Sequence, residues 1–197
     1  MKKFGLILLF CAAAVITYAL INNPSPTAPT PDSANAVEWV SIQEAEQLVK
    51  KKGNKDKKLL VDLYTDWCGW CKKMDANTFT NPEVAAYLKE NYIAVKLNAE
   101  SKNTITFNGK TYDFVAQGRR GTNMIAVELG AVNGRIGYPT LVFLDESLQK
   151  IQAIPGYQTP DALLPMLHYF AEDHYLSTPW EQYKQTFNEM KGGDFVD

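Results

Sequence analysis

Apolar and polar positions alternate along the chain in a way that predicts interleaved strands and helices from about Val37 onward. Ser41 with Glu44 three residues later predicts a capping box that opens a helix, and the mainly apolar segment 59–64 predicts a buried strand. Further strands are predicted at 92–97, 140–144 and 150–154, and further helices at 69–75, 82–91, 122–132, 160–171 and 178–191. Strands alternating with helices, ending in two strands joined by a short turn, predict an α/β sandwich with a central mixed sheet flanked by helices.

The segment between the strand at 92–97 and the helix at 122–132 has the pattern of a β-hairpin. Asn108-Gly109 lies between two runs of β-favouring residues, so the segment Thr104–Tyr112 predicts a β-hairpin with a type I′ turn. The segment 118–121 is predicted to be a basic turn that precedes the helix at 122–132.

The first 36 residues do not have the pattern of a folded domain. Lys2 and Lys3 precede an uncharged, mostly apolar run over residues 4–21, which predicts an export signal. The run is long for a cleaved signal peptide and just long enough for a membrane anchor, and both interpretations stay open. Residues 22–36 are rich in proline and small polar residues and predict an extended linker, so the folded domain is expected at 37–197.

Composition and charge exclude one class of partner. Hydrophobic residues make up 46% of the chain and charged residues 21%, and the formal net charge is −2. The lysines between positions 50 and 58 form the main basic cluster, which is typical of a solvated helix end and loop. Nucleic acid is therefore not an expected partner.

The chemistry of the chain is expected at Cys68-Gly69-Trp70-Cys71, which follows a predicted strand and opens a predicted helix. Unpaired backbone N–H groups at a helix N-terminus stabilise a thiolate, so we expect a lowered pKa for Cys68. Thiolate is the nucleophile of disulfide exchange, which makes Cys68 the predicted attacking thiol. Cys71, one helical turn later, is the predicted resolving thiol.

Two other interpretations of this cysteine pair are weaker. A zinc site needs more ligands, and His168 and His174 lie far along the chain without metal-ligand spacing. A purely structural disulfide would close a very short loop and would constrain the unfolded chain little. We therefore expect no metal and no cofactor other than the redox-active disulfide itself.

The segment 60–72 resembles the active-site strand and helix of the thioredoxin superfamily, and Gly137-Tyr138-Pro139-Thr140-Leu141 resembles its second signature. The resemblance covers about residues 37–171 and is closest to exported thioredoxin-like proteins with a Cys-Gly-Trp-Cys-Lys-Lys-Met motif. It implies a thioredoxin-like sandwich with a β-hairpin insertion and an extra C-terminal helix.

The resemblance also implies roles for single residues. Asp62 matches a buried carboxyl behind the cysteines that takes the proton of the resolving thiol, and Lys96 matches the lysine that faces this carboxyl. Pro139 matches a proline that is cis in the superfamily and packs beside the sulfurs, leaving the backbone of Tyr138 free to bind a substrate strand. The predicted substrate-binding residues are Trp67, Gly69, Trp70, Tyr138, Pro139 and Gly156.

Three departures from the thioredoxin pattern matter. Trp70 stands where thioredoxin has proline, and this leaves the direction of electron flow open. The insertion 101–121 is either a decorative surface hairpin or a substrate-selecting element in which Phe107 and Tyr112 contact a client. Replacing Thr104–Tyr112 by a short loop is expected to be tolerated, to leave the redox potential unchanged and to alter client selectivity. The helix at 178–191 carries Trp180, Tyr183 and Phe187 at helical spacing, which is typical of a packing face.

These observations favour a thiol–disulfide oxidoreductase that reduces protein disulfides outside the cytoplasm. The expected protein is a periplasmic or otherwise exported monomer that receives electrons from a membrane thiol–disulfide carrier. A disulfide oxidase or isomerase is the enzymatic alternative. A non-catalytic thioredoxin-like module that binds clients is the alternative of another class, although the paired cysteines with Asp62 and Lys96 argue against it.

Overall fold

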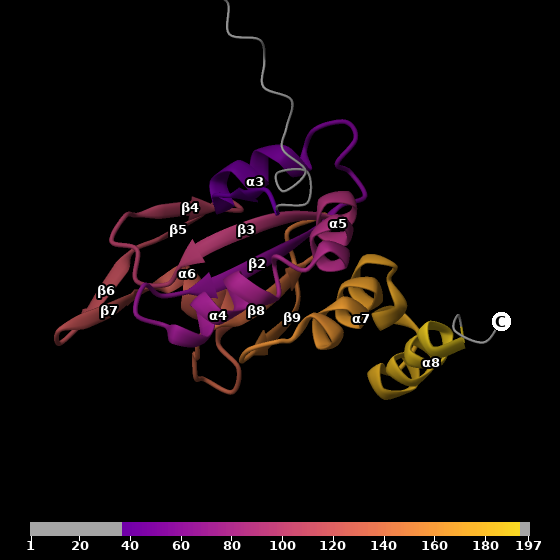
Figure 1. Ribbon diagram of the computed structural model, residues 1–197. Helices are drawn as coiled ribbons and strands as arrows, with labels where there is room; N and C mark the ends of the chain where they lie inside the picture. The colour runs from indigo at the N-terminus through magenta and orange to yellow at the C-terminus, as the bar shows by residue number, and fades with distance from the viewer. Residues whose placement is uncertain (1–36, 194–197) are drawn as a thin grey trace, which may run out of the picture. The chain divides into compact units, whose positions relative to one another are not determined.

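A five-stranded sheet forms the centre of the computed structural model, which describes residues 37–193 (Figure 1). The strand order is β1-β3-β2-β8-β9. Strands β1 and β2 run parallel to β3, whereas β8 runs antiparallel to both β2 and β9. The predicted α/β sandwich with a mixed sheet is therefore confirmed. The strands are β1 (Trp39–Val40), β2 (Lys58–Tyr64), β3 (Tyr92–Asn98), β8 (Thr140–Leu144) and β9 (Lys150–Pro155).

Helices cover both faces of this sheet (Figure 1). One apolar cluster joins the sheet to α3 and α6, and the other joins it to α4, α5 and α7. In β2, Leu59, Val61 and Leu63 enter the first cluster and Leu60 enters the second, so Asp62 shares its face of the strand with Leu60. The helices are α3 (Ile42–Val49), α4 (Gly69–Asn77), α5 (Pro82–Asn91), α6 (Met124–Gly130), α7 (Pro160–Ala171) and α8 (Trp180–Gly193).

The helix start signals in the sequence act as expected. Ser41 and Glu44 form the predicted capping box of α3. The side chains of Asn81 and Thr159 accept hydrogen bonds from the first turns of α5 and α7, each of which begins with a proline. These caps set the residue at which each helix begins, and so they also set where the preceding loop ends.

The insertion contains two hairpins rather than one. The first consists of β4 (Ile105–Phe107) and β5 (Lys110–Tyr112), and Asn108 and Gly109 between them have the positive φ values of 48° and 73° that the predicted turn needs. The second consists of β6 (Phe114–Gln117) and β7 (Arg120–Asn123) and was not predicted. Its strand β7 occupies residues 122–123, so the helix predicted from 122 begins at Met124.

The first hairpin is part of the core, which contradicts the prediction of a removable surface hairpin. Ile105, Phe107 and Tyr112 are buried in the same cluster as α3 and α6. Phe107 and Tyr112 therefore pack inside the protein and are not available to contact a client.

The C-terminal helix α8 attaches through aromatic rings, as its spacing predicts. Tyr183 and Phe187 are buried, and Trp180 packs against the same cluster. Tyr169 of α7 meets both Trp180 and Tyr183, with ring centroids 5.2 and 5.0 Å apart. The helix was expected to end before Gly192 and instead includes Gly193; a 3₁₀ turn, His174–Leu176, precedes it.

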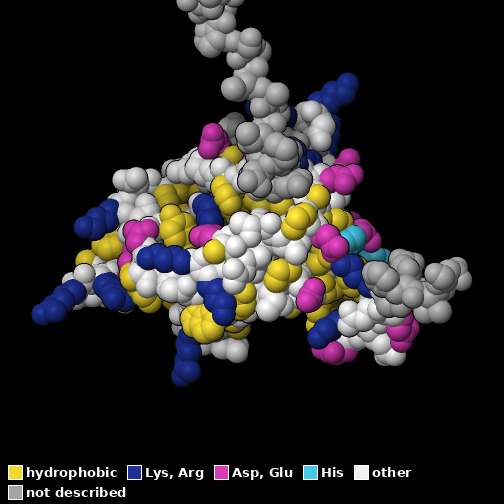
Figure 2. All heavy atoms as spheres, in the orientation of Figure 1, with side chains coloured by type: hydrophobic (Ala, Val, Ile, Leu, Met, Phe, Trp, Pro, Cys, Tyr) yellow, Lys and Arg dark blue, Asp and Glu magenta, His cyan; other side chains and the backbone are white. Residues whose placement is uncertain are grey.

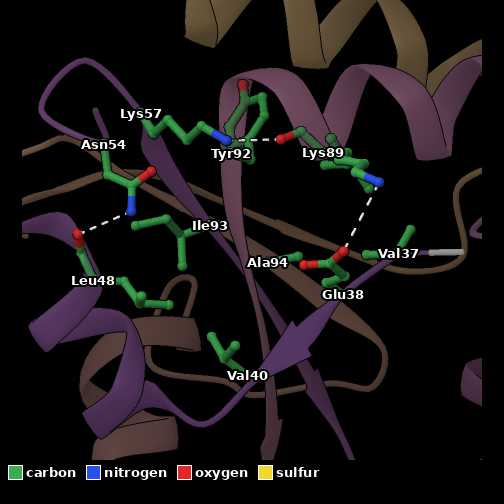
Figure 3. A pocket seen from close by; sticks show the side chains of 11 residues that line it. Val37, Glu38, Val40, Leu48, Asn54, Lys57, Lys89, Tyr92, Ile93 and Ala94 are labelled. Atoms are coloured by element: carbon green, nitrogen blue, oxygen red, sulfur yellow. Dashed lines mark hydrogen bonds and ion pairs between the residues drawn. The ribbon is translucent and has the colours of Figure 1, made fainter. Parts of the chain in front are cut away.

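Near the start of the described chain, a cavity of about 190 Å³ lies beside the first residues of β3 (Figure 3). Lys57 donates a hydrogen bond to the carbonyl oxygen of Lys89 at its rim. The predicted export signal at 1–21 and linker at 22–36 lie outside the described residues. Within 37–193, no helix is both long enough and apolar enough to cross a bilayer.

Candidate active site

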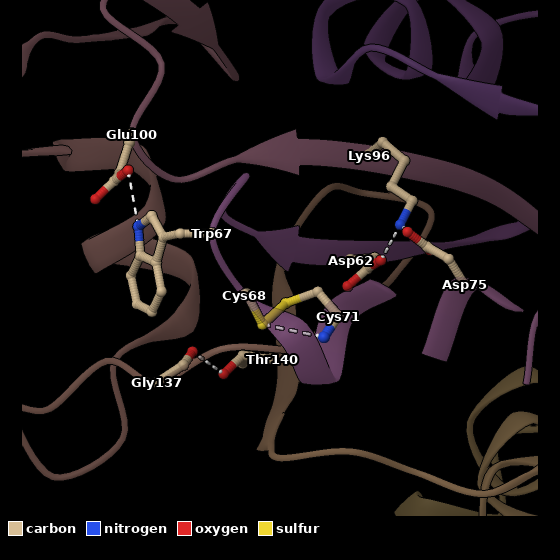
Figure 4. The surroundings of a disulfide bond; sticks show 9 residues. All are labelled: Asp62, Trp67, Cys68, Cys71, Asp75, Lys96, Glu100, Gly137 and Thr140. Atoms are coloured by element: carbon tan, nitrogen blue, oxygen red, sulfur yellow. Dashed lines mark hydrogen bonds and ion pairs between the residues drawn. A yellow bond between two sulfur atoms is a disulfide. The ribbon is translucent and has the colours of Figure 1, made fainter. Parts of the chain in front are cut away.

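Cys68 and Cys71 form a disulfide at the N-terminus of α4 (Figure 4). Cys68 is the N-cap residue of the helix, and its Sγ accepts a hydrogen bond of 3.0 Å from the backbone N–H of Cys71. The strand-to-helix placement predicted from the sequence is therefore confirmed. When the pair is reduced, the same N–H and the helix dipole are available to stabilise a thiolate at Cys68.

Both cysteine residues of the pair are buried, Cys71 slightly more than Cys68. Cys68 retains 4% of its surface and Cys71 only 1%. The two tryptophans beside them are 50% (Trp67) and 57% (Trp70) exposed, so apolar surface lies next to the cysteine pair. Cys68 is thus slightly more exposed than Cys71, and the assignment of Cys68 as the attacking thiol stays a prediction.

Asp62 lies behind the disulfide on β2 and is fully buried. Burial raises the pKa of this carboxyl from 3.8 to about 6, and the attraction of Lys96 opposes the rise. One carboxyl oxygen accepts a hydrogen bond of 2.5 Å from Lys96 Nζ, whereas the other, Oδ1, has no hydrogen-bond partner in the described chain. In Figure 4 the carboxyl lies between Lys96 and the cysteines. Asp62 can thus exchange a proton near neutral pH.

Lys96, the neighbour of Asp62 on β3, is held by two carboxylates and three rings. Burial lowers the pKa of Lys96, but its ion pairs with Asp62 and Asp75 outweigh this effect and raise the pKa. The ring centroids of Trp39, Tyr64 and Phe79 lie 4.8, 5.2 and 5.4 Å from Nζ. Lys96 therefore stays charged and keeps the carboxyl of Asp62 in place.

The Trp67 side of the disulfide is organised by three neighbours from different elements. The indole N–H of Trp67 donates a hydrogen bond of 3.0 Å to Glu100 Oε2. The guanidinium of Arg120, from β7, lies 4.2 Å from the centroid of the indole ring. Tyr138 meets the same indole edge-to-face, with centroids 6.0 Å apart. Trp67 is thus exposed but held in place.

The Trp70 side carries a shallow cavity of about 270 Å³ lined by Trp70, Tyr138, Pro139, Gly156 and Tyr157. The peptide bond Tyr138–Pro139 is cis, as the resemblance implied. Gly156 has a φ of +96°, and no atom lies within 4 Å of where a Cβ would be. The cavity therefore keeps an open, mostly apolar floor beside Trp70.

Comparison with known proteins places this geometry in a family. Residues 43–171 match the thioredoxin-like domain. The protein belongs to the thioredoxin-like family. A structural neighbour, a thioredoxin-fold protein from Helicobacter pylori, has a TM-score of 0.50 at 17% identity, covers 77% of this chain and 92% of its own, and supports the fold alone.

Two curated relatives of this thioredoxin-like protein are thiol:disulfide interchange proteins DsbD. The protein from Haemophilus ducreyi is 29% identical over 175 residues, which is 85% of this chain and 26% of that protein. The protein from Actinobacillus pleuropneumoniae is 28% identical over 150 residues, 74% of this chain and 22% of that protein. The chain thus spans about a quarter of the length of these relatives.

In this thioredoxin-like domain the predicted site residues gather at one end of the sheet. A disulfide joins Cys68 and Cys71, an ion pair joins Asp62 and Lys96, and Figure 4 shows the two pairs close together. Pro139 and Gly156 line the cavity beside Trp70. At Gly69, the first residue of α4, an added Cβ would meet no atom within 4 Å.

Sequence reasoning missed five side chains of this region: Lys73, Asp75, Glu100, Arg120 and Tyr157. Asp75 carried a usable signal, because it lies four residues after Cys71 and hence on the same face of the helix. Glu100 and Arg120 carried none, because only the fold brings them to Trp67.

Proposed function

We propose that the protein is a thiol–disulfide oxidoreductase that reduces disulfides of proteins outside the cytoplasm. The observation that carries this proposal is a Cys-x-x-Cys disulfide at a helix N-terminus, backed by a buried carboxyl with a raised pKa. The redox couple is the Cys68–Cys71 pair itself, so no other cofactor is required.

The reaction consists of two exchanges. In the reduced protein, the Cys68 thiolate attacks one sulfur of a client disulfide, the client S–S bond breaks, and the other client sulfur leaves as a thiolate that takes up a proton. Cys71 then loses its proton and attacks Cys68 Sγ in the mixed disulfide. The second client thiol leaves, and the Cys68–Cys71 disulfide forms. Two electrons pass from the protein to the client.

Asp62 is the proton acceptor for the second exchange in this proposal. Its free oxygen Oδ1 lies on a carboxyl placed beside the cysteine pair, and a pKa of about 6 keeps most of the group deprotonated at neutral pH. Lys96 fixes the other oxygen and so orients the carboxyl.

The same carboxyl favours the reducing direction. Strong oxidants of this class have a reduced form that is stabilised. A negative charge beside the sulfurs makes the thiolate less favourable, which destabilises the reduced form and lowers the reduction potential. The relationship to DsbD proteins, named thiol:disulfide interchange proteins, supports the same activity class.

The partners follow from this reaction. Clients are proteins with accessible disulfides, and the electron donor is a membrane thiol–disulfide carrier, because the described domain contains a single cysteine pair. We propose a monomer in the periplasm or a comparable compartment, either released or anchored through residues 4–21. Anchoring would raise the effective concentration of the domain near a membrane donor.

The reduction potential of the Cys68–Cys71 pair tests the direction. Equilibration with a dithiol buffer of known potential is expected to give a value near that of thioredoxin, about −270 mV. A value near about −120 mV, as for strong oxidants, would contradict reduction and favour the oxidase alternative.

The order of attack is tested by trapping. We expect Cys71→Ser to accumulate mixed disulfides between Cys68 and client proteins, visible on non-reducing gels, because the resolving thiol is gone. The matched variant Cys68→Ser should trap none. Trapping by Cys68→Ser in place of Cys71→Ser would reverse the two roles, and trapping by neither would refute the exchange mechanism.

A further inference from the structure

Each exposed tryptophan of the site carries a cation on its ring. Arg120 lies over Trp67 with a distance of 4.2 Å, and Lys73 Nζ lies 4.9 Å from the centroid of Trp70 and 5.3 Å from that of Tyr157. The two pairs have different surroundings: Trp67 also contacts Glu100, whereas Trp70 also contacts Tyr157. Each tryptophan next to a cysteine of the motif therefore brings a positive charge to the site.

Neither cation is neutralised by a carboxylate. Among residues 37–193, every ion pair involves other basic groups, and Lys73, Arg119 and Arg120 take part in none. A cation on a ring face keeps its N–H donors available, and the guanidinium in particular can bind a carboxylate in a bidentate way. Both charges are thus free to receive an acidic side chain.

The hairpin that delivers Arg120 has a fixed shape. Gly121 lets the Phe114 ring cross the hairpin, because a Cβ at this position would lie 2.3 Å from Phe114 Cζ and 2.5 Å from the Val115 carbonyl oxygen. Gly118 has a φ of +62° and forms the turn beside Arg119. The β6–β7 hairpin therefore holds Arg119 and Arg120 in a defined position.

A cavity of about 390 Å³ is lined by this hairpin, by Asp66 and by residues from 98–102 at and after the end of β3. Its charged lining residues are Asp66, Glu100, Lys102, Arg119 and Arg120, so cations outnumber carboxylates there. Glu100 is also engaged by the Trp67 indole. Figure 2 shows Lys and Arg side chains projecting from the end of the domain that carries this hairpin. This local excess of positive charge contrasts with a net charge of −2 for the whole chain.

We propose that the two tryptophan–cation pairs form a docking surface for acidic client segments, in which Asp or Glu residues flank the client cysteine. Arg120 receives an acidic side chain beside Trp67, and Lys73 receives one beside Trp70. The exposed indoles contact the apolar parts of the same segment. The proposal rests on the proposed function and names the class of client that the site prefers. Opposite charges around the site should act mainly on the rate of encounter.

The test uses two peptides that are identical except for the residues next to their intramolecular disulfide, Glu in one and Lys in the other. The reduced protein is mixed with each peptide, and the second-order rate constant of exchange is measured. We expect the Glu peptide to react about tenfold faster at low salt, with the ratio shrinking at high salt.

The variants Arg120→Gln and Lys73→Gln should each lower this preference about threefold, and Arg120→Glu combined with Lys73→Glu should invert it. Lys184→Gln removes the same charge on α8, at the other end of the domain, and should leave the preference unchanged (Figure 1). Equal rates for both peptides, or a preference that survives the double reversal, would overturn the proposal.

A second measurement separates this proposal from the proposed function. Serine versions of both peptides cannot exchange, and their binding is followed through tryptophan fluorescence. Tighter binding of the Glu version, lost in the double reversal, would support the docking surface even if no exchange with any disulfide occurred, in which case only the proposed function would fail. Charge-dependent binding to anionic vesicles, with no preference between peptides, would assign the surface to membranes and overturn the proposal.

Discussion

The two hairpins of the insertion are neighbours in sequence and opposites in role. The β4–β5 hairpin places Ile105, Phe107 and Tyr112 in the core beside α3. The β6–β7 hairpin exposes residues 115–120 and reaches the disulfide region through Arg120. The first hairpin therefore stabilises the domain, whereas the second forms part of the exposed surface near the disulfide. A hairpin's place in the sequence does not indicate which of these it serves; the burial of its alternate side chains does.

The largest expected effect on the free energy of unfolding comes from a substitution in the first hairpin. Phe107 is 2% exposed, and Phe107→Ala should lower the free energy of unfolding by about 3–5 kcal/mol through the lost contacts and the cavity left behind. Val115 in the second hairpin is 43% exposed, and Val115→Ala should change it by less than about 0.5 kcal/mol. Urea unfolding monitored by circular dichroism measures both. Similar losses in the two variants would erase the distinction between the hairpins.

Asp62 extends the comparison to a residue outside both hairpins, because it lies on β2 behind the cysteine pair. Folding raises its pKa from 3.8 to about 6, so the folded protein holds this proton more tightly than the unfolded chain does. The resulting stability is fully present below pH 3.8 and is lost as the pH rises through 6. Asp62→Asn should remove this loss and raise the free energy of unfolding at pH 8 by up to about 3 kcal/mol.

The same variant should slow exchange. Release of trapped client by Cys71 is expected to lose its dependence on a group with a pKa of about 6, and its rate should fall at pH 7. Stopped-flow exchange from pH 5 to 9 measures this, with Lys184→Gln as a control. A profile identical to that of the parent would assign Asp62 to structure alone.

Gly121→Ala breaks the second hairpin locally. The added methyl would meet Phe114 and the Val115 carbonyl, so we expect the free energy of unfolding to fall by about 1–3 kcal/mol. Amide hydrogen exchange in β6 and β7 should also become faster. Gly118→Ala meets no neighbour and should cost only about 1 kcal/mol, from its positive φ. If hydrogen exchange found β4–β5 opening as well, the two hairpins would be one unit.

A small effect on stability is expected for Arg120→Gln. The exposed guanidinium–indole contact contributes about 0.5–1 kcal/mol, so the free energy of unfolding should fall by no more than this. Trp67 should lose part of its fixed orientation, which its fluorescence anisotropy would report. A loss of several kcal/mol would mean that this hairpin also stabilises the core.

Much of the fold follows from local sequence signals. The caps at Ser41, Asn81 and Thr159 and the Asn108-Gly109 turn are local, and the structure confirms each of them. The placement of the first hairpin was wrong because alternation in so short a segment does not reveal whether its apolar face meets the core or solvent.

The second hairpin was missed for another reason. Its turn has Gly118 followed by Arg119, a weaker signal than Asn-Gly, its strands are short, and β7 (Arg-Gly-Thr-Asn) has no apolar side chain. The site shows the same limit. The cysteine motif, Asp62 and Lys96 were visible from the sequence, whereas the contacts of Trp67 with Glu100 and Arg120 join residues far apart in the chain.

The β6–β7 hairpin has a consequence for solubility. It is a two-stranded sheet that pairs with no other strand in the described chain, although the Asn123 N–H at the end of β7 donates to the Ala99 carbonyl oxygen, so most of its outer edge has no strand partner. Such edges are templates for association with a second molecule, and proteins protect them with short strands and charged side chains. Strands of four residues with two adjacent arginines at the turn provide both protections. The charges that we assign to client docking therefore also discourage this edge from pairing with another copy at high concentration.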